Sequence, residues 1–357
     1  MPIDVDPVTA AEAADAAMEL VRFDAEVSPR PGGSGVDVWT QPTVLLHAEA
    51  TASSRIEQVT AGARALALAT IGKSGDSNAG LVAANVHATE RAIALPDGVT
   101  ADGIVQVQDA LLTDSAPGHA GGFRNVPVWI GSFGCTPHTA SFVAPRPERV
   151  PELMGDLVAF IRRTDVDPFV QAAVAHAQFE TIHPFTDGNG RTGRALVQAM
   201  LRRNGITRRL TVPLSAGLLA STDSYYAAFG SYRDGDLNDL VTSFAAAAHW
   251  ASAHGRDMVR DLESLMESWT DRLKARSHAA VWKALPLLIQ QPAVTVQFLA
   301  ESLGASEPAA QHAVDQMVEA GILAPVDARR RSRMWTADEV IQVADGFASR
   351  ADRRSGS

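Results

Sequence analysis

The chain has 357 residues, 46% of them hydrophobic, and a formal net charge of −10. This length can bury a substantial core and predicts more than one domain, and the acidic balance argues against general binding to nucleic acid or to a membrane surface. A single cysteine, Cys135, excludes an internal disulfide framework and a multi-cysteine metal site. The first residues lack a signal-peptide pattern, and no apolar run is long enough to span a membrane, so we expect a soluble cytoplasmic protein without a membrane partner.

Helical patterns dominate the first third of the chain. A stretch rich in proline, glycine and serine at residues 28–35 is typical of a loop. The second expected helix is interrupted near Thr51–Ser54. The helices expected here from apolar periodicity cover residues 9–23, 44–69, 81–94 and 104–112.

Two short β-prone stretches, residues 126–131 and 140–143, come next and predict a hairpin-like excursion. More helical patterns follow, and the last of them has one expected break at Gly255. The helices expected in this part cover residues 150–161, 169–180, 192–203, 221–232 and a long stretch from 237 towards 276. This part of the chain is therefore expected to be mainly all-α with a small β-hairpin.

The pattern changes after residue 276. A helix, an extended segment, two more helices and a pair of strands around the basic loop 329–333 predict a winged helix-turn-helix domain at residues 278–357. Its second helix, at residues 307–316, carries no Arg or Lys, which helices that enter a DNA groove normally use. The basic loop could contact a phosphate backbone. DNA binding therefore stays open, but contact with protein or structural support is favoured.

The stretch from His183 to Arg194, HPFTDGNGRTGR, is the richest in reactive groups. It contains the spacing G-x-G-x-x-G, but a helix precedes it and no acidic residue follows about 20 positions later, so it is not a dinucleotide fingerprint. The Gly-Lys-Ser/Thr of a P-loop and the ligand spacing of a calcium loop are also absent. The plain alternative is a glycine turn between two helices.

These residue types together suit a nucleoside triphosphate. Gly188 and Gly190 let backbone amides approach an anion, and the helix expected from Thr192 points its amino end at the same place. Arg191 and Arg194 are forked donors for phosphate oxygens. An aspartate at 187 is a hard ligand for Mg²⁺, and a histidine at 183 is a natural general base.

The stretch resembles the Fic motif H-x-F-x-D/E-G-N-G-R-x-x-R, and every fixed position matches. Further similarity at residues 122–131 and 224–236 extends the resemblance over most of residues 40–250. It implies a helical Fic (Fido) catalytic core at 101–255 that carries a β-hairpin flap. We expect an N-terminal helical region at 1–100 before the core and a linker helix at 256–277 after it.

The resemblance implies AMP transfer from ATP to a Ser, Thr or Tyr hydroxyl of a protein, with loss of pyrophosphate. His183 would deprotonate the hydroxyl and Asp187 would hold Mg²⁺. Gly190, at a position where some relatives carry Lys and transfer phosphate instead, favours AMP transfer. The residues expected to bind ATP are Asp187, Gly188, Asn189, Gly190, Arg191, Thr192, Gly193, Arg194, Tyr225 and Tyr226.

Two further elements are implied by the same resemblance. The flap would align the target side chain by strand-like pairing through His138, Thr139, Ala140, Ser141 and Phe142. The segment Ser53–Glu57 resembles the family's inhibitory motif S/T-x-x-x-E-G/N, in which Glu57 would pair with Arg194 and block the γ-phosphate, although Gln58 stands where the motif has Gly or Asn. The plain alternative is that Glu57 is a solvated helix residue.

The expected function is therefore an autoinhibited protein adenylyltransferase whose target could include the chain itself. Members of the family often dimerise, so a homodimer is one expectation. A nucleotide-sensing, DNA-binding regulator is an alternative, which the intact His183 disfavours because a sensor needs no base. A second alternative is an enzyme that removes AMP at the same site, with Glu57 positioning water.

Overall fold

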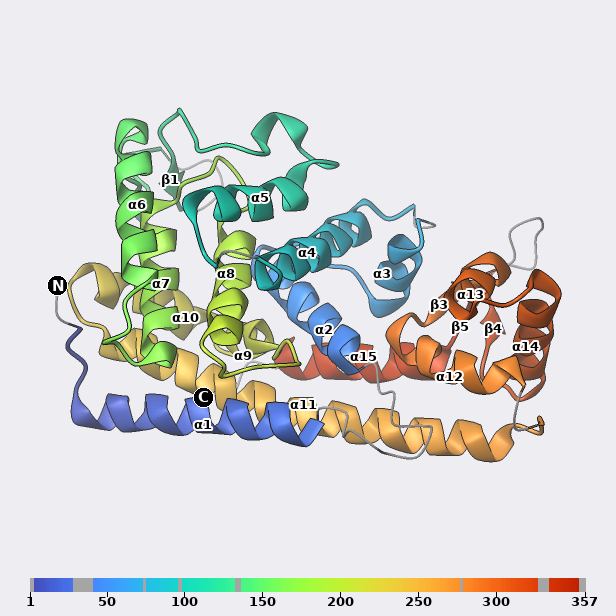
Figure 1. Ribbon diagram of the computed structural model, residues 1–357. Coiled ribbons are helices and arrows are strands. Elements are labelled where there is room, and N and C mark those ends of the chain that lie inside the picture. Colours follow the sequence, from blue (N-terminus) through green and yellow to red (C-terminus); the bar gives the residue numbers. More distant parts are fainter. Residues whose placement is uncertain are drawn as a thin grey trace.

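The computed structural model describes residues 3–27, 41–72, 75–95, 98–131, 136–276, 279–326 and 334–352. Helices dominate this part of the chain, as expected, and two small antiparallel sheets complete it (Figure 1). The first helices are α1 (Pro7–Val27), α2 (Gln41–Ile56), α3 (Ala63–Thr70), α4 (Ser77–Ile93) and α5 (Ala101–Leu112). The central helices are α6 (Val150–Ile161), α7 (Pro168–Ile182), α8 (Asn189–Arg203), α9 (Leu214–Ala220), α10 (Thr222–Arg233) and α11 (Asn238–Arg272). The last are α12 (Ala280–Gln290), α13 (Val296–Leu303), α14 (Glu307–Glu319) and α15 (Asp338–Asp352).

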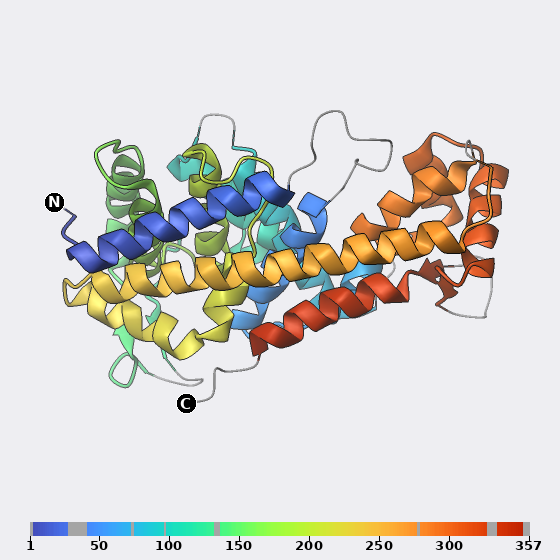
Figure 2. The same cartoon turned by 90° about the horizontal axis from the view of Figure 1, so that it is seen from below.

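The long helix α11 organises the fold. It runs along one side of the molecule, and α1 and α15 pack against it (Figure 2). Helices α7 and α8 pack together, and α4 and α5 both contact α8. The main cluster of buried hydrophobic residues reaches from Phe23 in α1 to Trp335 near the C-terminal end. The C-terminal elements therefore share a core with the helices that precede them.

Helix α11 is not interrupted at Gly255, so the break expected there was wrong. A Cβ added to Gly255 would lie 2.6 Å from the ring of Phe23 in α1. The glycine is needed for the close approach of the two helices, which outweighs its low helix propensity. The helix also continues across the expected boundary at residue 255, and the domain division itself stays a prediction.

Helix α2 also differs from the prediction, because it continues through Thr51–Ser54. The hydroxyl of Ser53 accepts a hydrogen bond from Arg194, and that of Ser54 accepts one from Asn85. Serine disfavours helix interiors mainly by bonding to nearby backbone groups. Here long-range partners engage both hydroxyls, and the helix continues to Ile56.

The expected hairpin is present as two short strands, β1 (Trp129–Ile130) and β2 (Phe142–Val143). They pair antiparallel, with Trp129 opposite Val143 and Ile130 opposite Phe142. Residues 132–135, which include Cys135, lie outside the described residues.

The C-terminal elements follow the expected order. Strands β3 (Ala293–Thr295), β4 (Ala324–Pro325) and β5 (Met334–Thr336) form an antiparallel sheet with β5 in the middle, and α12, α13 and α14 pack beside it. The basic loop 329–333 lies outside the described residues, and the winged-helix assignment stays a prediction. Helix α15 was not foreseen, and it packs back against α2, α3, α9 and α11.

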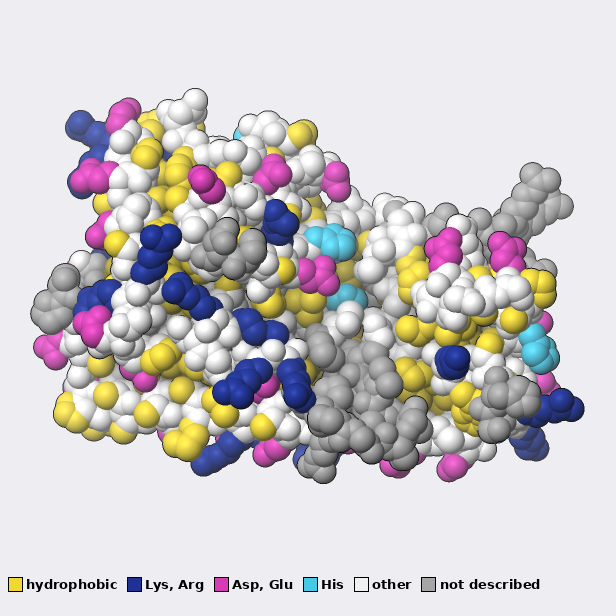
Figure 3. All heavy atoms as spheres, viewed as in Figure 1, with side chains coloured by type: hydrophobic (Ala, Val, Ile, Leu, Met, Phe, Trp, Pro, Cys, Tyr) yellow, Lys and Arg dark blue, Asp and Glu magenta, His cyan; other side chains and the backbone are white. Residues whose placement is uncertain are grey.

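The surface charge is uneven. On the face shown in Figure 3, Lys and Arg side chains gather over the lower part of α8 and the loop after it, where Arg203, Arg208 and Arg209 are exposed. None of the described helices combines the length and the apolar character that a membrane crossing requires.

Candidate active site

The loop between α7 and α8 is fixed by Asn189. Its side-chain oxygen accepts a hydrogen bond from the backbone N–H of Phe185 at 2.9 Å, and its amide group donates to the carbonyl of Phe185 at 2.8 Å. Asn189 and Phe185 are both buried. Because the ring of Phe185 anchors the loop in the core, His183 and Asp187 are held at its two ends.

We expect Asn189→Ala to destabilise the chain by about 2 kcal/mol, because two buried backbone groups of Phe185 would lose their partners. Urea denaturation monitored by circular dichroism would measure the loss. Asn204→Ala, an exposed position at the end of the same helix, is the matched control. Equal stabilities of the two variants would contradict this role for Asn189.

Helix α8 begins at Asn189, three residues before the expected start. Gly188 precedes it with φ +82°, a left-handed conformation, and a Cβ there would also lie 2.9 Å from Leu111. A glycine is required at this position for both reasons. The first N–H groups of α8 have no partner within the helix, and the positive end of the helix dipole lies here.

These N–H groups face a cleft of about 470 Å³ whose lining includes Glu57, His183, Asp187, Gly190 and Arg191. The cleft therefore contains the predicted base, the predicted metal ligand and the predicted inhibitory residue. The volume is sufficient for the phosphate part of a nucleotide.

Arg191 contributes a poorly satisfied positive charge to this cleft. Its side chain is only 7% exposed, and among the described residues it forms one ion pair, with Asp187 at 3.5 Å. Its Nε and Nη1 atoms are buried and have no hydrogen-bond partner in the described part of the chain. Burial lowers the pKa of Arg191, as expected for a guanidinium that is taken out of water without full pairing. An anion in the cleft would satisfy this group.

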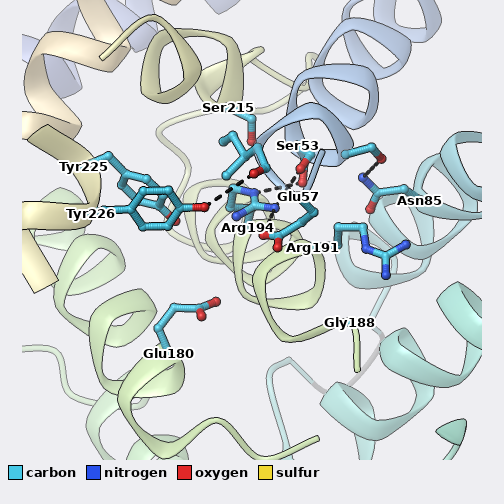
Figure 4. Close-up of polar contacts among 12 residues, drawn as sticks. Ser53, Glu57, Asn85, Glu180, Gly188, Arg191, Arg194, Ser215, Tyr225 and Tyr226 are labelled. Carbon is cyan, nitrogen blue, oxygen red and sulfur yellow. Dashed lines mark hydrogen bonds and ion pairs between the residues drawn. The ribbon is translucent and has the colours of Figure 1, made fainter. Parts of the chain in front are cut away.

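Arg194, in contrast, is fully engaged (Figure 4). Its Nη2 atom donates to Oε1 of Glu57 at 2.9 Å and to the carbonyl of Ser53 at 2.7 Å, while Nε donates to the Ser53 hydroxyl at 2.9 Å. Burial is the largest single influence and opposes the charge, but Glu57 together with Tyr225 and Glu180 outweighs it and holds the pKa of Arg194 above its usual value. The sequence-based pairing of Glu57 with Arg194 is thus present in the structure.

Glu57 also lies directly over the start of α8. A Cβ added to Gly190 would come within 1.9 Å of Oε1 of Glu57. The glycine at 190 therefore leaves room for the carboxylate in the place where the resemblance puts a phosphate. The next residue, Gln58, has φ +61°, which costs a non-glycine residue about 1 kcal/mol and gives a reason for Gly or Asn at this position of the motif.

His183 ends α7 with φ +48°. Burial lowers its pKa to about 4, so the imidazole is neutral near pH 7. Its Nδ1 atom is buried without a hydrogen-bond partner among the described residues, and Oε2 of Glu180 is 3.8 Å away. A neutral imidazole at the rim of an anion-binding cleft can accept a proton from a hydroxyl group.

Glu180, which the sequence analysis did not single out, lies below Tyr226 and Arg194 in Figure 4. Its side chain is 15% exposed, and Oε1 has no hydrogen-bond partner in the described structure. Burial first, and then the negative charge of Glu57, raise the pKa of Glu180 to about 8. The feature of the sequence that could have identified Glu180 is its position three residues before His183.

The raised pKa predicts a pH-dependent stability. Between the unfolded value of 4.5 and about 8, the folded chain holds a proton on Glu180 that the unfolded chain has released. The contribution of Glu180 to stability therefore falls as the pH rises through this window. We expect the unfolding free energy of Glu180→Gln, relative to the natural chain, to rise by about 1–3 kcal/mol between pH 5 and pH 8. A difference that stays constant in urea titrations at both pH values would contradict this protonation.

Two more side chains that the sequence analysis did not assign to the site position the loop. Arg124 donates from Nε to the carbonyl of His183 at 2.7 Å and from Nη2 to that of Pro145 at 2.6 Å, so it joins the motif to the end of the hairpin. Gln108 in α5 donates to the carbonyls of Asp187 and His119, at 3.3 and 2.7 Å. Both act across long sequence separations.

The other residues expected to bind ATP are placed differently. Thr192 is buried and Gly193 packs against His176 and Glu180, so both support the helix. Tyr225 is buried, and its hydroxyl lies 2.6 Å from Nε2 of His176.

Tyr226 is 48% exposed, and its hydroxyl donates to the carbonyl of Ile56, next to Glu57, at 3.4 Å. Within the tyrosine pair, only Tyr226 is open to solvent in this structure. ATP binding by Tyr225, Tyr226, Thr192 and Gly193 stays a prediction.

The predicted flap residues lie at the hairpin. His138, Thr139 and Ser141 are exposed in the connection, and Phe142 is in β2. The guanidinium of Arg233 lies 4.5 Å from the centre of the Phe142 ring, which ties the flap to α10. Their role in target binding stays a prediction.

Asp187 is the residue expected to hold the metal ion. The described residues contain no group of three or more His, Cys, Asp and Glu side chains that could hold a metal ion. Asp187 is a single carboxylate, 50% exposed, at the edge of the cleft. This suits Mg²⁺, which proteins commonly hold through one or two carboxylates together with substrate phosphates.

Comparisons with known proteins agree with this geometry. The Fic/DOC family matches residues 98–201. Protein adenylyltransferase fic-1 of Caenorhabditis elegans is 32% identical over 148 residues, 41% of this chain and 26% of fic-1. Protein adenylyltransferase Fic of Nematostella vectensis is 32% identical over 112 residues, 30% of this chain and 24% of the relative. The matched segment spans about a quarter of the length of these curated relatives.

Solved structures support the fold. A crystal structure of a Fic family protein from Desulfovibrio desulfuricans G20 matches with a TM-score of 0.58 and 22% identity, over 94% of this chain and 97% of that one. A Fic-1 fragment from C. elegans matches with a TM-score of 0.52 and 22% identity, over 71% and 74% of the two chains. The chain therefore has the helical fold of these solved structures, and the stretch from His183 to Arg194 lies inside the segment that matches the Fic/DOC family.

Proposed function

We propose that the chain is a protein adenylyltransferase, which transfers AMP from ATP to a Ser, Thr or Tyr hydroxyl of a protein and releases pyrophosphate. The observation that carries the proposal is the cleft at the start of α8. A neutral His183 lies at its rim, and the incompletely paired, buried Arg191 lies inside it. The names of the curated relatives, protein adenylyltransferases, agree with this reading.

The cleft supplies three features that triphosphate binding needs. The free N–H groups and the dipole of α8 attract anionic oxygens. Arg191 offers two nitrogen atoms, Nε and Nη1, that have no hydrogen-bond partner among the described residues, and Arg194 offers its guanidinium once Glu57 leaves. Mg²⁺ held by Asp187 would neutralise part of the phosphate charge.

The transfer would then need one proton acceptor. The neutral imidazole of His183 takes the proton of the target hydroxyl as the oxygen attacks the α-phosphorus of ATP. A new bond forms between this oxygen and the α-phosphorus, the bond from the α-phosphorus to the bridging oxygen breaks, and pyrophosphate leaves. The exposed hairpin beside the cleft would present the target chain.

The chain as it stands would be autoinhibited. The Glu57 carboxylate occupies Arg194 and the space over Gly190, where the β- and γ-phosphates are expected. Removal of AMP from modified proteins is a second use of the same site, because Glu57 is a carboxylate within reach of water in the cleft. The DNA-binding alternative has less support, since α14 carries no Lys or Arg. The homodimer and the cytoplasmic location stay predictions.

The position of the label on ATP tests the proposal. The variant Glu57→Gly would be incubated with Mg²⁺, a cell lysate, and ATP labelled on either the α- or the γ-phosphate. We expect covalent label on protein from α-labelled ATP and none from γ-labelled ATP. Label from the γ-position would indicate phosphate transfer. No label from either, with ATP still bound, would overturn the transferase assignment, and loss of AMP from labelled protein would favour the hydrolase.

A further inference from the structure

The C-terminal helix α15 contacts the end of α2, just before Glu57. Arg55 of α2 forms an ion pair with Asp352 of α15 and donates to the carbonyl of Ala348 at 3.2 Å. Arg55 lies two residues before Glu57 and, unlike Glu57, does not line the catalytic cleft. It lines a separate cavity of about 390 Å³ whose walls include α2 and α15. In Figure 1, α15 runs beneath α2.

Two more polar contacts join α15 to the segment after Glu57. The backbone N–H of Ala63 donates to Oδ1 of Asp345 at 3.0 Å, and Nη2 of Arg64 donates to Oδ1 of Asp338 at 2.6 Å. Together with the Arg55 pair, these contacts bracket the turn that carries Glu57. Both ends of this turn are thus fixed by the same helix.

The conformation of the turn shows why it needs support. Gln58 is held at φ +61°, a left-handed conformation that a non-glycine residue adopts rarely. Such a conformation persists only where the surroundings impose it. The local backbone bonds run from the N–H groups of Glu57 and Val59 to the carbonyl of Ser54, at 3.1 and 3.0 Å, and from the N–H group of Gln58 to that of Arg55, at 2.9 Å. On one side the turn joins the end of α2 and on the other it leads to α3, and α15 contacts both.

Helix α15 is also connected to the C-terminal elements and to α11. It follows the central strand β5 after one residue. Glu339 accepts hydrogen bonds from Trp269 and Arg272 of α11, both at 2.7 Å, and Arg350 lies 3.5 Å from Asp257 and Asp261 of the same helix. A displacement of the C-terminal sheet would therefore move the helix that holds the Glu57 turn.

We propose that α15 is a latch that keeps Glu57 on Arg194, so that displacement of α15 relieves the inhibition. This inference rests on the proposed adenylyltransferase activity and its autoinhibition by Glu57. It makes the C-terminal elements a regulatory unit of the catalytic site. A displacement of α15 would reach the Glu57 turn through its contacts with Arg55, Ala63 and Arg64.

The test uses the full chain and initial rates of AMP transfer from α-labelled ATP. We expect Arg55→Ala and Asp352→Asn each to raise the rate about twofold to fivefold, as for the loss of one partly exposed ion pair. The matched control is Asp165→Asn, which removes an exposed ion pair with Arg163 that involves neither α2 nor α15; its rate should equal that of the natural chain. Thermal unfolding would verify that each variant is folded. If Arg55→Ala does not fold, Asp352→Asn, at the end of α15, still tests the same contact.

Glu57→Gly separates the two proposals. In this background, Asp352→Asn should give no further increase, because the latch acts only through Glu57. If Glu57→Gly is activated but Arg55→Ala and Asp352→Asn behave like the natural chain, the latch is overturned and autoinhibition stands. A further increase in the Glu57→Gly background also overturns the latch. If Glu57→Gly itself is not activated, the autoinhibition fails and the latch fails with it.

Discussion

Glu57→Gly is expected to raise the rate of AMP transfer about 10- to 100-fold. The carboxylate of Glu57 lies 2.9 Å from Nη2 of the buried Arg194 and over Gly190, so ATP must displace it to place its terminal phosphates there. A hydrogen bond between two charged groups contributes about 1.5–3 kcal/mol, which corresponds to this range of rates. Initial rates with α-labelled ATP would measure the change.

Glu57→Gln separates charge from size in this experiment. The amide keeps the length of the side chain and one oxygen, but it loses the negative charge that competes with phosphate, so an intermediate rate is expected. Titration of ATP and ADP by calorimetry should show a larger gain for ATP, because the γ-phosphate gains most from a free Arg194. Equal rates for the natural chain, the glutamine and the glycine variant would exclude inhibition by Glu57.

His183→Ala, made in the active Glu57→Gly background, is expected to lower kcat by about 10²- to 10⁴-fold, the usual contribution of a general base. The affinity for ATP should change little, since the binding groups identified here are those of α8 and its arginines. His87→Ala, an exposed histidine in α4, is the matched control. A His183→Ala variant that keeps most of its rate would remove His183 from the role of base.

The pH profile provides a second readout for His183. Because burial lowers its pKa to about 4, the imidazole stays unprotonated, and thus able to accept a proton, well below pH 6. We expect kcat/KM to hold between pH 7 and about pH 5 and to fall as the pH approaches 4. A decline centred near 6.5, the ordinary value for histidine, would contradict the buried position of His183 in the active form.

The sequence alone identified most of the secondary structure and the core of the site. Helix α6 has the expected bounds, and the strands of the hairpin lie within the two β-prone stretches. The site was recognisable because its residues lie in one twelve-residue run whose geometry is local. Asn189 bonds to Phe185 four residues away, and Gly188 alone allows the left-handed turn before α8.

Errors arose where a distant part of the chain decided the local structure. Gly255 looked like a break, but it is a contact point for Phe23 of α1, 232 residues earlier in the sequence. Ser53 and Ser54 looked like an interruption, but Arg194 and Asn85 use their hydroxyls. Arg124 was not recognised as a support of the motif because its partner, the carbonyl of His183, is 59 residues away.

The sequence by itself determined the chemical groups of the candidate site, because a histidine, a carboxylate and a glycine-containing helix start are encoded by neighbouring residues. The tertiary structure decided which distant residues meet this stretch. The pairing of Glu57 with Arg194 spans 137 residues, and that of Arg55 with Asp352 spans 297. Such contacts depend on which helix faces pack together, and this is set by the whole core, which no short stretch of sequence specifies.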